Sequence, residues 1–256
     1  MNKKMLSLPY LFWCAAFILI PLAMVFYYGF TDKTGAFTLE NILAIATPEH
    51  FKALRISILL SLIATVVCLL LAYPLAMILA RMEVNTHSFI VLIFILPMWM
   101  NFLLRTMAWQ TLLEKNGVIN SALSFLHLPS LNLINTPGAI ILGMVYNFLP
   151  FMVLPIYNSL TKIDQNVINA ARDLGANSVH TFFKITLPLS LPGVISGITM
   201  VFVPALTTFV ISTLLGGSKI LLIGNVIEQE FTQTGNWHLG SGLSMVLMLF
   251  IIVNMV

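Results

Sequence analysis

The segment from Asp164 to Pro188 is a group of polar and charged side chains, and long apolar runs flank it on both sides. Asp164 is expected to begin a short helix, because a carboxylate accepts the unpaired amide groups of a first turn. One face of that helix is apolar at positions i, i+3, i+4 and i+7, which are occupied by Val167, Ala170, Ala171 and Leu174. The chemistry that this pattern favours is binding. The face can dock on a partner protein or rest on lipid headgroups, and the residues alone leave both interpretations open.

The residues around this face predict a helix, a turn and a second helix. The other faces of the first helix carry Gln165, Asn166, Asn169, Arg172 and Asp173. Gly175 is expected to end it, because glycine adopts the left-handed conformation of a helix end at least cost. Asn177 can cap a second short helix over Ser178–Ile185. Pro188 falls where the next apolar run begins, in a first turn that needs no amide from it.

The chain offers no arrangement that would support catalysis or metal binding. Its histidines are scattered, without a pair four residues apart: His50, His87, His127, His180 and His238. No glycine-rich phosphate loop and no nucleophile–base set occurs. Cys14 and Cys68 lie in apolar runs, where a cysteine acts as a small packing residue. We therefore expect no catalytic residue, no metal and no cofactor in this chain.

The composition indicates a membrane protein. Of the 256 residues, 59% are hydrophobic and 8% are charged, and the mean hydropathy is +0.98. A soluble domain has about 25% charged residues, so this chain cannot cover a water-facing surface of its size. The net charge of +3 gives no reason to expect a nucleic-acid partner.

Six apolar runs are candidate membrane spans, since a span needs about 20 residues. They cover residues 8–30, 56–80, 89–113, 137–160, 189–215 and 240–256. All six should be helices, because lipid cannot satisfy the backbone groups of an open strand. The predicted fold class is an all-α, polytopic membrane protein, with one transmembrane domain over residues 1–256. The last run stops at Val256 without polar closing residues, so we expect an early end there, by truncation or by natural brevity.

The positive-inside rule sets the expected orientation. The Lys3–Lys4 pair flanks the first span and favours a cytoplasmic N-terminus. This places the polar segment 161–188 in the cytoplasm. The outer segments are then Thr31–Arg55, Glu114–Thr136 and Gly216–Leu239. Within the second of these, Val118–Leu128 is too short to span and is expected to be an interfacial helix.

Polar and aromatic residues within or beside the spans are candidates for lining a transport path. They are Trp99, Asn101, Tyr146, Asn147 and Phe209. Each can equally pack between helices or face lipid. Arg105 can face such a path or extend its guanidinium to the outer interface. At the outer mouth, Glu228, Glu230 and Trp237 can meet a cation or a receptor, or lie in a solvated loop. Gly193-x-x-x-Gly197 predicts a close approach of two helices.

The polar segment resembles the EAA signature of ABC-importer permeases. Ala170-Ala171 is followed by Gly175 after three residues, by Ile185 after nine more, and then by Leu187-Pro188. Asn169 departs from the pattern, since the family usually has Glu there. Softer similarity over most of residues 56–240 points to the B-type permease of spermidine/putrescine importers. It includes Asn135-Thr136-Pro137, Leu149-Pro150-Phe151 and Leu214-Leu215-Gly216-Gly217.

The resemblance implies a fold, a mechanism and partners. The fold would be that of the MetI-like ABC permeases, in a bacterial inner membrane. A second homologous permease would complete the path, and an extracytoplasmic binding protein would deliver a polyamine. Two copies of a cytoplasmic ATPase, which binds ATP and Mg, would dock on residues 164–188, the loop that forms the coupling helices in the family. The docking residues carried over are Val167, Asn169, Ala170, Ala171, Arg172, Asp173, Leu174 and Gly175.

Alternative functions make different demands on the sequence. A stand-alone secondary carrier is expected to show intramembrane acids or an inverted repeat, and an intramembrane enzyme needs paired acids, His ligands or a nucleophile–base set. We find none of these. The absence of Asp and Glu deep within the spans fits a path that binds a cation weakly and leaves recognition to a receptor. Within the ABC class, another small solute remains an alternative cargo.

Overall fold

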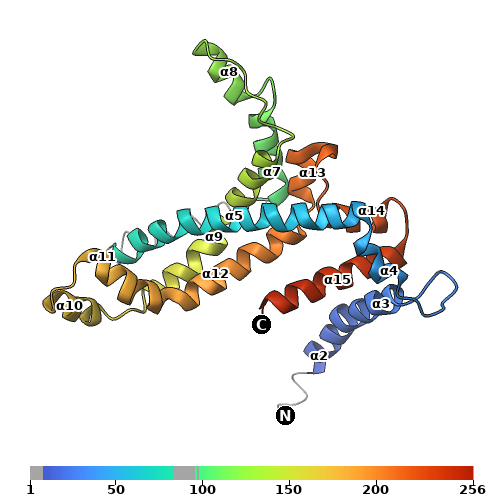
Figure 1. Cartoon of the computed structure of the whole chain (residues 1–256), viewed down its shortest axis with the longest axis horizontal. Coiled ribbons are helices and arrows are strands. Elements are labelled where there is room, and N and C mark those ends of the chain that lie inside the picture. The colour runs from blue at the N-terminus through green and yellow to red at the C-terminus, as the bar shows by residue number, and fades with distance from the viewer. Residues whose placement is uncertain (1–7, 83–95, 97, 256) are drawn as a thin grey trace. The chain divides into compact units, whose positions relative to one another are not determined.

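The computed structural model describes residues 8–82, 96 and 98–255 and is built from helices. Among these residues the extended pairing is limited to one isolated bridge between Thr31 and Phe37. The chain divides into two compact units. Unit 1 comprises Met1–Arg55 and Leu222–Val256, and unit 2 comprises Ile56–Leu221 (Figure 1). The prediction of a single membrane domain remains a prediction.

Unit 1 is formed by the N-terminal and the C-terminal parts of the sequence. The first helix runs without a break through α2 (Leu8–Cys14), a π-helical turn (Ala15–Leu19) and α3 (Ile20–Gly29), and it covers almost the whole range of the predicted first span. The short helix α4 (Glu40–Leu43) follows, and α14 (Ile223–Thr232) and α15 (Trp237–Met255) come from the far end of the sequence. α15 packs on α3 and α4. A Cβ atom on Gly242 would lie 2.5 Å from the Asn41 carbonyl oxygen, so glycine is needed for this approach.

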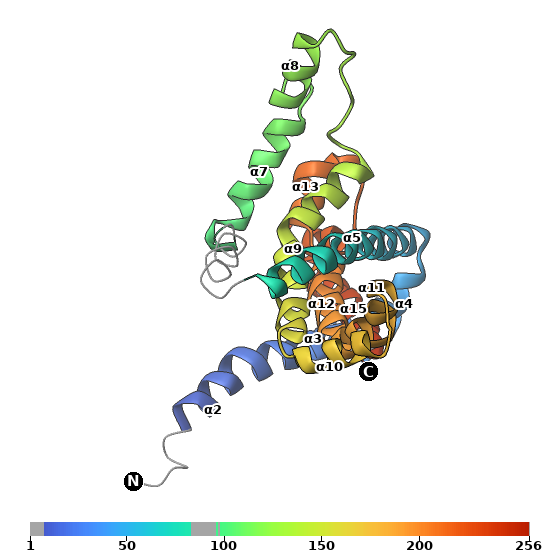
Figure 2. The same ribbon diagram turned by 90° about the vertical axis from the view of Figure 1, so that its left-hand side faces the viewer.

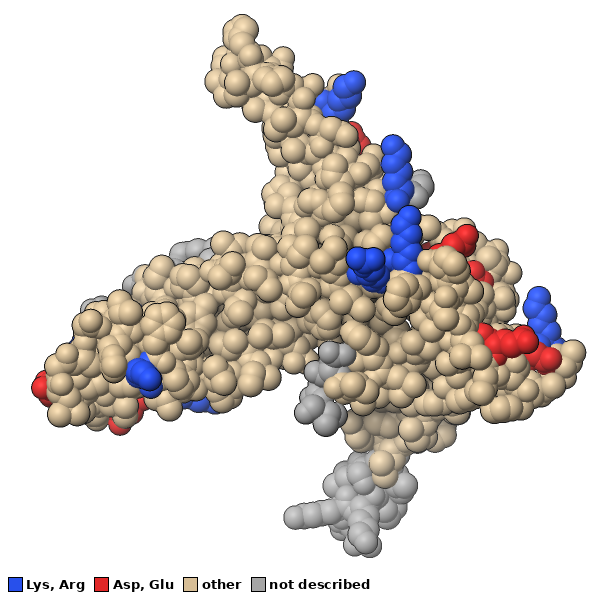
Figure 3. Space-filling model, in the orientation of Figure 1, with Lys and Arg blue, Asp and Glu red and all other residues tan. Residues whose placement is uncertain are grey.

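Unit 2 contains a long antiparallel helix pair. α5 (Pro48–Arg81) carries the chain into it and begins eight residues before the predicted second span. α9 (Pro137–Leu160) matches the predicted fourth span, and α12 (Leu187–Thr207) packs along it. Residues 56–80, 137–160 and 187–215 contain no charged side chain. Figure 3 shows charged side chains around the α10 end of unit 2 and none on the neighbouring stretch of this face.

Two glycines determine how closely α12 approaches α9. A Cβ atom on Gly193 would lie 2.5 Å from both the Pro155 carbonyl oxygen and the Ser159 Cβ. One on Gly197 would lie 2.7 Å from the Met152 sulfur. The close approach predicted from the Gly-x-x-x-Gly pattern is thereby confirmed. Small residues at such a contact allow the two backbones to reach van der Waals distance.

The predicted third and fifth spans differ from the structure. Most of residues 89–101 lie outside the described residues, and α7 (Phe102–Leu113) begins only after Asn101. The predicted span over 189–215 is two helices, because Thr208 is extended (ψ 138°) and α13 (Val210–Gly216) starts after Phe209. Hydroxyl groups near the break compete for backbone carbonyls: the Thr207 Oγ1 donates to the Val203 oxygen at 3.1 Å.

The predicted interfacial segment contains α8 (Val118–Phe125), and Figure 2 shows it following α7 away from α9. The buried Asn120 side chain holds the chain that returns from it. Its Nδ2 donates to the Leu131 carbonyl (3.0 Å) and the Glu114 carbonyl (3.2 Å), and its Oδ1 accepts from the Leu131 amide (2.8 Å). The interfacial location of this helix remains a prediction.

Four helices in the described part of the chain are long and apolar enough to cross a membrane. They are Pro9–Gly29, Pro48–Arg81, Pro137–Leu160 and Ser178–Thr207. The predicted sixth span lies in the shorter apolar helix Trp237–Val253. A count of six spans and the orientation in the membrane therefore stay predictions.

Candidate functional site

The polar segment folds around α10 (Gln165–Asp173), as the sequence predicted. The Asp164 Oδ1 accepts the Asn166 amide at 2.9 Å and caps the first turn. At the other end, Gly175 has a φ of +85°, its amide donates to the Arg172 carbonyl at 2.9 Å, and the Ala176 amide donates to the Ala171 carbonyl at 3.0 Å. These bonds satisfy the last carbonyls of the helix through a left-handed residue.

Most of the apolar face predicted on α10 is exposed in the part of the chain that the structure describes. Leu174 is 89% exposed and Val167 is 45% exposed, and Ala170 between them is exposed. Ala171 and Ile168 are half-buried and form the inner side of the helix. An isolated helix of nine residues is too short to be stable by itself, so an exposed apolar face on it is typical of a surface that another molecule covers.

α10 lies at the end of the α9–α12 pair, opposite α13 (Figures 1 and 2). A tight turn over residues 161–164 joins it to α9. On its other side, the Asn177 Oδ1 accepts the His180 amide at 2.8 Å and caps α11 (Ser178–Thr181), as predicted.

The second helix of the polar segment is longer than predicted. It does not end at Ile185 but continues through a π-helical turn (Phe182–Thr186) into α12, as one helix over Ser178–Thr207. Pro188 sits in the first turn of α12, directly after the π-helical turn. A proline would disrupt an uninterrupted α-helix, because it lacks an amide and its ring meets the carbonyl four residues back. The widened turn provides a local change in the hydrogen-bond ladder at that point.

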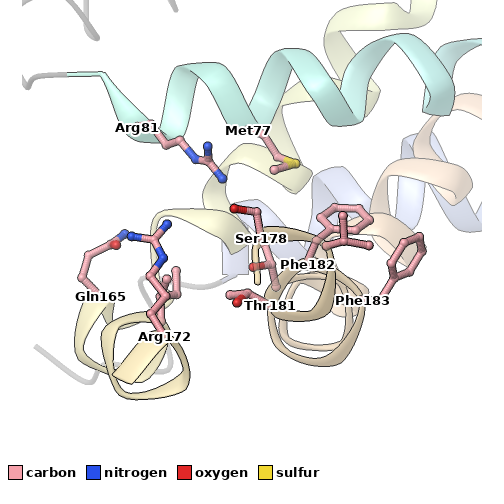
Figure 4. A pocket seen from close by; sticks show the side chains of 11 residues that line it. Met77, Arg81, Gln165, Arg172, Ser178, Thr181, Phe182 and Phe183 are labelled. Carbon is pink, nitrogen blue, oxygen red and sulfur yellow. The ribbon is translucent and has the colours of Figure 1, made fainter. Parts of the chain in front are cut away.

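A pocket of about 500 Å³ separates α10 from the end of α5 (Figure 4). Arg81 from α5 and Arg172 from α10 extend into it, with Gln165 beside Arg172. A second pocket of about 420 Å³ lies on the Leu174–Gly175 side of α10, with Lys184 in its wall. α10 thus has a hollow on each flank, one of them lined by two arginines.

The proposed path residues lie at three separate places in unit 2. Trp99 is 78% exposed, and Asn101 caps α7, because its Oδ1 accepts the amides of Leu103 (2.8 Å) and Leu104 (3.3 Å). Phe209 forms the junction of α12 and α13. Neither these three residues nor the other two path candidates, Tyr146 and Asn147, line the pockets described in this section. Their role in a path remains a prediction.

Tyr146 and Asn147 of α9 contact α7. The Tyr146 ring packs edge-on against Trp109, with the centroids 5.4 Å apart. Asn147 is 1% exposed, and its Nδ2 donates to the Gly143 carbonyl at 2.9 Å and to the Thr106 hydroxyl at 3.5 Å. A hydrogen bond between helices, one of the two sequence interpretations of Asn147, is therefore present.

Arg105 of α7 is largely buried in this subunit. It is 8% exposed, and its Nε and Nη1 have no hydrogen-bond partner among the described residues. The Asn147 Oδ1 is likewise buried without a described partner. Both interpretations of Arg105, a path-facing side chain and one that reaches the outer interface, stay predictions. Thr106 and Trp109 of the same helix contact α9.

The predicted outer-mouth residues belong to unit 1 and do not form one site. The carboxylates of Glu228 and Glu230 accept the hydroxyls of Thr232 (2.9 Å) and Thr234 (2.8 Å), four residues on along the chain. Trp237 instead packs against other rings and lines a pocket of about 430 Å³ that the glutamates do not reach.

A tight turn near this pocket is ordered by Asp32. Its Oδ1 accepts the Thr34 hydroxyl (2.6 Å), the Thr34 amide (2.8 Å) and the Ala36 amide (2.9 Å). The hydrogen bond from the Thr34 hydroxyl, followed by those from the two amides, lowers the pKa of Asp32 below its ordinary value of 3.8.

The family model and the curated relatives that match this sequence all describe membrane components of transport systems. The family model described as "Binding-protein-dependent transport system inner membrane component" matches residues 4–256. The spermidine/putrescine transport system permease protein PotB of Haemophilus influenzae is 37% identical over 240 residues, which is 91% of this chain and 84% of that protein. PotB of Escherichia coli is 37% identical over 243 residues, covering 92% of this chain and 88% of that protein.

Solved structures agree in fold. A bacterial ABC transporter involved in the import of the acidic polysaccharide alginate has a chain that superposes with a TM-score of 0.78 at 16% identity. The superposition covers 98% of this chain and 91% of that one. The same score and identity hold for the alginate transporter in complex with its alginate pentasaccharide-bound periplasmic protein. At this identity the likeness concerns the fold alone.

Proposed function

The chain belongs to the family of binding-protein-dependent transport system inner membrane components, and on that premise we propose that it forms part of an ATP-driven polyamine importer, powered through α10. Members of this family are non-catalytic permease subunits of ABC importers. The chain is accordingly an inner-membrane transport subunit of a system that works with a substrate-binding protein. The proposal concerns its cargo, its path and its ATPase contact.

The observation that carries the ATPase contact is the exposed apolar face of α10. A capped helix projects from the end of the α9–α12 pair and presents Val167, Ala170 and Leu174 to solvent. The left-handed turn at Gly175 orients the helix relative to α11. Two copies of a cytoplasmic ATPase would bind this surface and its equivalent on a second permease. Asn169 cannot form the ion pair that a glutamate would form there, so the apolar contact must supply more of the affinity.

The cargo is inferred from sequence relatives and not from the fold. The relatives named for spermidine and putrescine transport are 37% identical over most of the chain. The fold neighbour imports an acidic polysaccharide, so the same architecture serves cargoes of opposite charge. The described part of the spans contains no Asp or Glu. We therefore place tight recognition of the polycation in the binding protein, which would meet the outer segments, and weak passage in this subunit.

Transport by the reconstituted complex tests the cargo. The chain, its partner permease and the ATPase would be placed in proteoliposomes, with the binding protein and labelled spermidine or putrescine outside. We expect uptake that requires ATP and that unlabelled polyamines abolish by competition. If an acidic oligosaccharide or a neutral sugar competed for uptake and polyamines did not, the polyamine assignment would be wrong.

A pair of substitutions at Gly175 tests the role of α10. Gly175→Pro cannot adopt a φ of +85° and loses the amide that bonds to Arg172, so it should abolish co-purification with the ATPase. Gly175→Asn tolerates the left-handed conformation and should retain it. Ala171→Asp, which places a charge on the docking helix, should act like the proline. Full recovery of the ATPase with Gly175→Pro in a correctly inserted subunit would rule out α10 as the contact.

A further inference from the structure

The pocket between α5 and α10 joins two chemically different halves. One half is polar and contains Arg81, Arg172 and Gln165. The other is apolar and contains Met77, Phe182 and Phe183. Figure 4 shows the two guanidinium groups directed into the same space from different helices, with the phenylalanine rings on the far wall.

The two arginines lack anionic partners within the described chain. Neither guanidinium has a hydrogen bond or an ion pair to any residue of 8–82, 96 or 98–255. They come from positions about ninety residues apart in sequence, so they meet only because α10 lies beside the end of α5. Two positive charges that converge on one pocket repel each other. An anion between them would convert that repulsion into two charge-assisted contacts.

The pocket lies at the end of a long uncharged helical stretch, where we expect a membrane to change from hydrocarbon to headgroups. Arg81 is the last residue of α5, and the 25 residues before it, 56–80, carry no charge. Met77 is one helical turn earlier, which is about 6 Å deeper along the helix axis. Side chains around the mouth of the pocket are apolar and exposed: Val179 is 65% and Phe183 is 59% exposed. A ligand that fills both halves must therefore carry an anionic head and an apolar tail.

We propose that this pocket binds an anionic glycerophospholipid, with its phosphate between Arg81 and Arg172 and an acyl chain along Met77 and Phe183. Guanidinium groups match phosphate oxygens through paired donors. Basic pockets between membrane helices at the cytoplasmic side bind anionic headgroups by this chemistry. A zwitterionic lipid fits less well, because its ammonium or choline group would add a third positive charge. A free phosphate would leave the apolar half empty.

The bound lipid would fix α10 against α5. Arg172 and Gln165 face the pocket, whereas Val167, Ala170 and Leu174 are exposed on the docking face. Lipid and ATPase would therefore occupy different sides of one short helix. The inference goes beyond the proposed function and does not rest on it, because lipid binding can be measured in the subunit without ATPase or cargo.

Native mass spectrometry of the full chain in detergent provides the test. Phosphatidylglycerol and phosphatidylcholine of the same acyl chains would be added to the wild type, to Arg81→Gln, to Arg172→Gln and to the double variant. We expect phosphatidylglycerol to bind in preference, and the double variant to lose about tenfold or more in its affinity, since each substitution removes one charge-assisted contact to the phosphate. Lys162→Gln removes one positive charge from the same segment without lining the pocket, and should change the affinity less than twofold.

Each other outcome would overturn the proposal. Equal binding of both lipids, or equal loss with Lys162→Gln, would show a non-specific response to net charge. Displacement of phosphatidylglycerol by excess inorganic phosphate would show a free-anion site. If the arginine variants bound the lipid normally and instead lost ATPase, the arginines would serve the protein partner. Unfolding temperatures measured in phosphatidylcholine alone should be the same for all variants, because both arginines are exposed.

Discussion

Leu174→Ala offers the sharpest test of the α10 docking surface. The side chain is 89% exposed in this chain, so its removal leaves no internal cavity. Its backbone amide still donates to the Ala170 carbonyl (3.1 Å), and the helix end is unchanged. Any effect of the substitution on ATPase binding must therefore come from contact with the partner.

The expected loss of binding free energy follows from the number of apolar carbons that Leu174 can bury against the partner. The substitution removes three carbons, each contributing about 0.8 kcal/mol when fully buried. Complete burial in the complex would thus weaken binding by about 2 kcal/mol, and half burial by about 1 kcal/mol. In dissociation constants this corresponds to roughly fivefold to thirtyfold, since 1.4 kcal/mol is a factor of ten.

The measurement is a titration of the cognate ATPase onto the permease complex in nanodiscs, read by biolayer interferometry. Phe125→Ala is the matched control, because Phe125 is 85% exposed on α8, outside the proposed surface. Its substitution should leave the affinity unchanged. The reasoning is refuted if Leu174→Ala binds within twofold of the wild type, or if both variants weaken binding equally.

Three further predictions concern packing, a loop and pH. Gly193→Ala places a Cβ 2.5 Å from an α9 carbonyl oxygen and should lower stability by about 1–3 kcal/mol, measured as a lower unfolding temperature in detergent. The control Gly138→Ala, whose nearest contact is 3.7 Å away, should leave the unfolding temperature unchanged. Equal shifts for the two variants would contradict the packing argument. Asn120→Ala should speed amide hydrogen exchange over residues 126–133, because it removes the hydrogen bonds that hold that loop; unchanged protection would count against it. The folded pKa of Asp32 lies below the ordinary 3.8, so the turn keeps its stabilisation above about pH 4 and loses it as the pH falls through the lower folded value. Thr34→Ala should raise the pKa of Asp32 toward 3.8 in an NMR titration, and an unchanged pKa would show that the hydroxyl is not its main cause.

The local chemistry of the docking segment could be predicted because it depends on neighbours in sequence. Asp164 and Asn177 cap helices, and Gly175 is left-handed; each of these features depends on hydrogen bonds that reach no more than three residues along the chain. The chain's apolar runs likewise identify its long helices. These features require only periodicity and the hydrogen-bonding needs of a helix end.

Other features could not be predicted because they depend on contacts between distant residues or on competition along one apolar run. Asn101 lies in the middle of an apolar run that predicts one span, yet its side chain caps the start of α7. Hydropathy does not show that a helix begins at this point. The burial of Arg105 depends on how α7 packs against its neighbours, which the apolar pattern of the run does not show. The pocket between Arg81 and Arg172 requires the three-dimensional approach of α5 and α10.

The continuity of helix Ser178–Thr207 determines how a pull on α10 would reach the membrane. Short turns separate α10 from both of its neighbours, over 161–164 on the α9 side and over 174–177 on the α11 side, whereas α11 runs into α12 as one helix. We propose that a movement of α11 would be passed to α12 along that helix. α12 is also tied to α5 near this end, through the 2.7 Å hydrogen bond between the Tyr73 and Ser190 hydroxyls and the edge-on contact of Tyr73 with Phe182. Phe182 begins the π-helical turn, so the start of that turn is itself held against α5 by Tyr73. The hydrogen-bond ladder of the helix changes within this turn, and we propose it as the point at which the helix would bend if a partner moved α10.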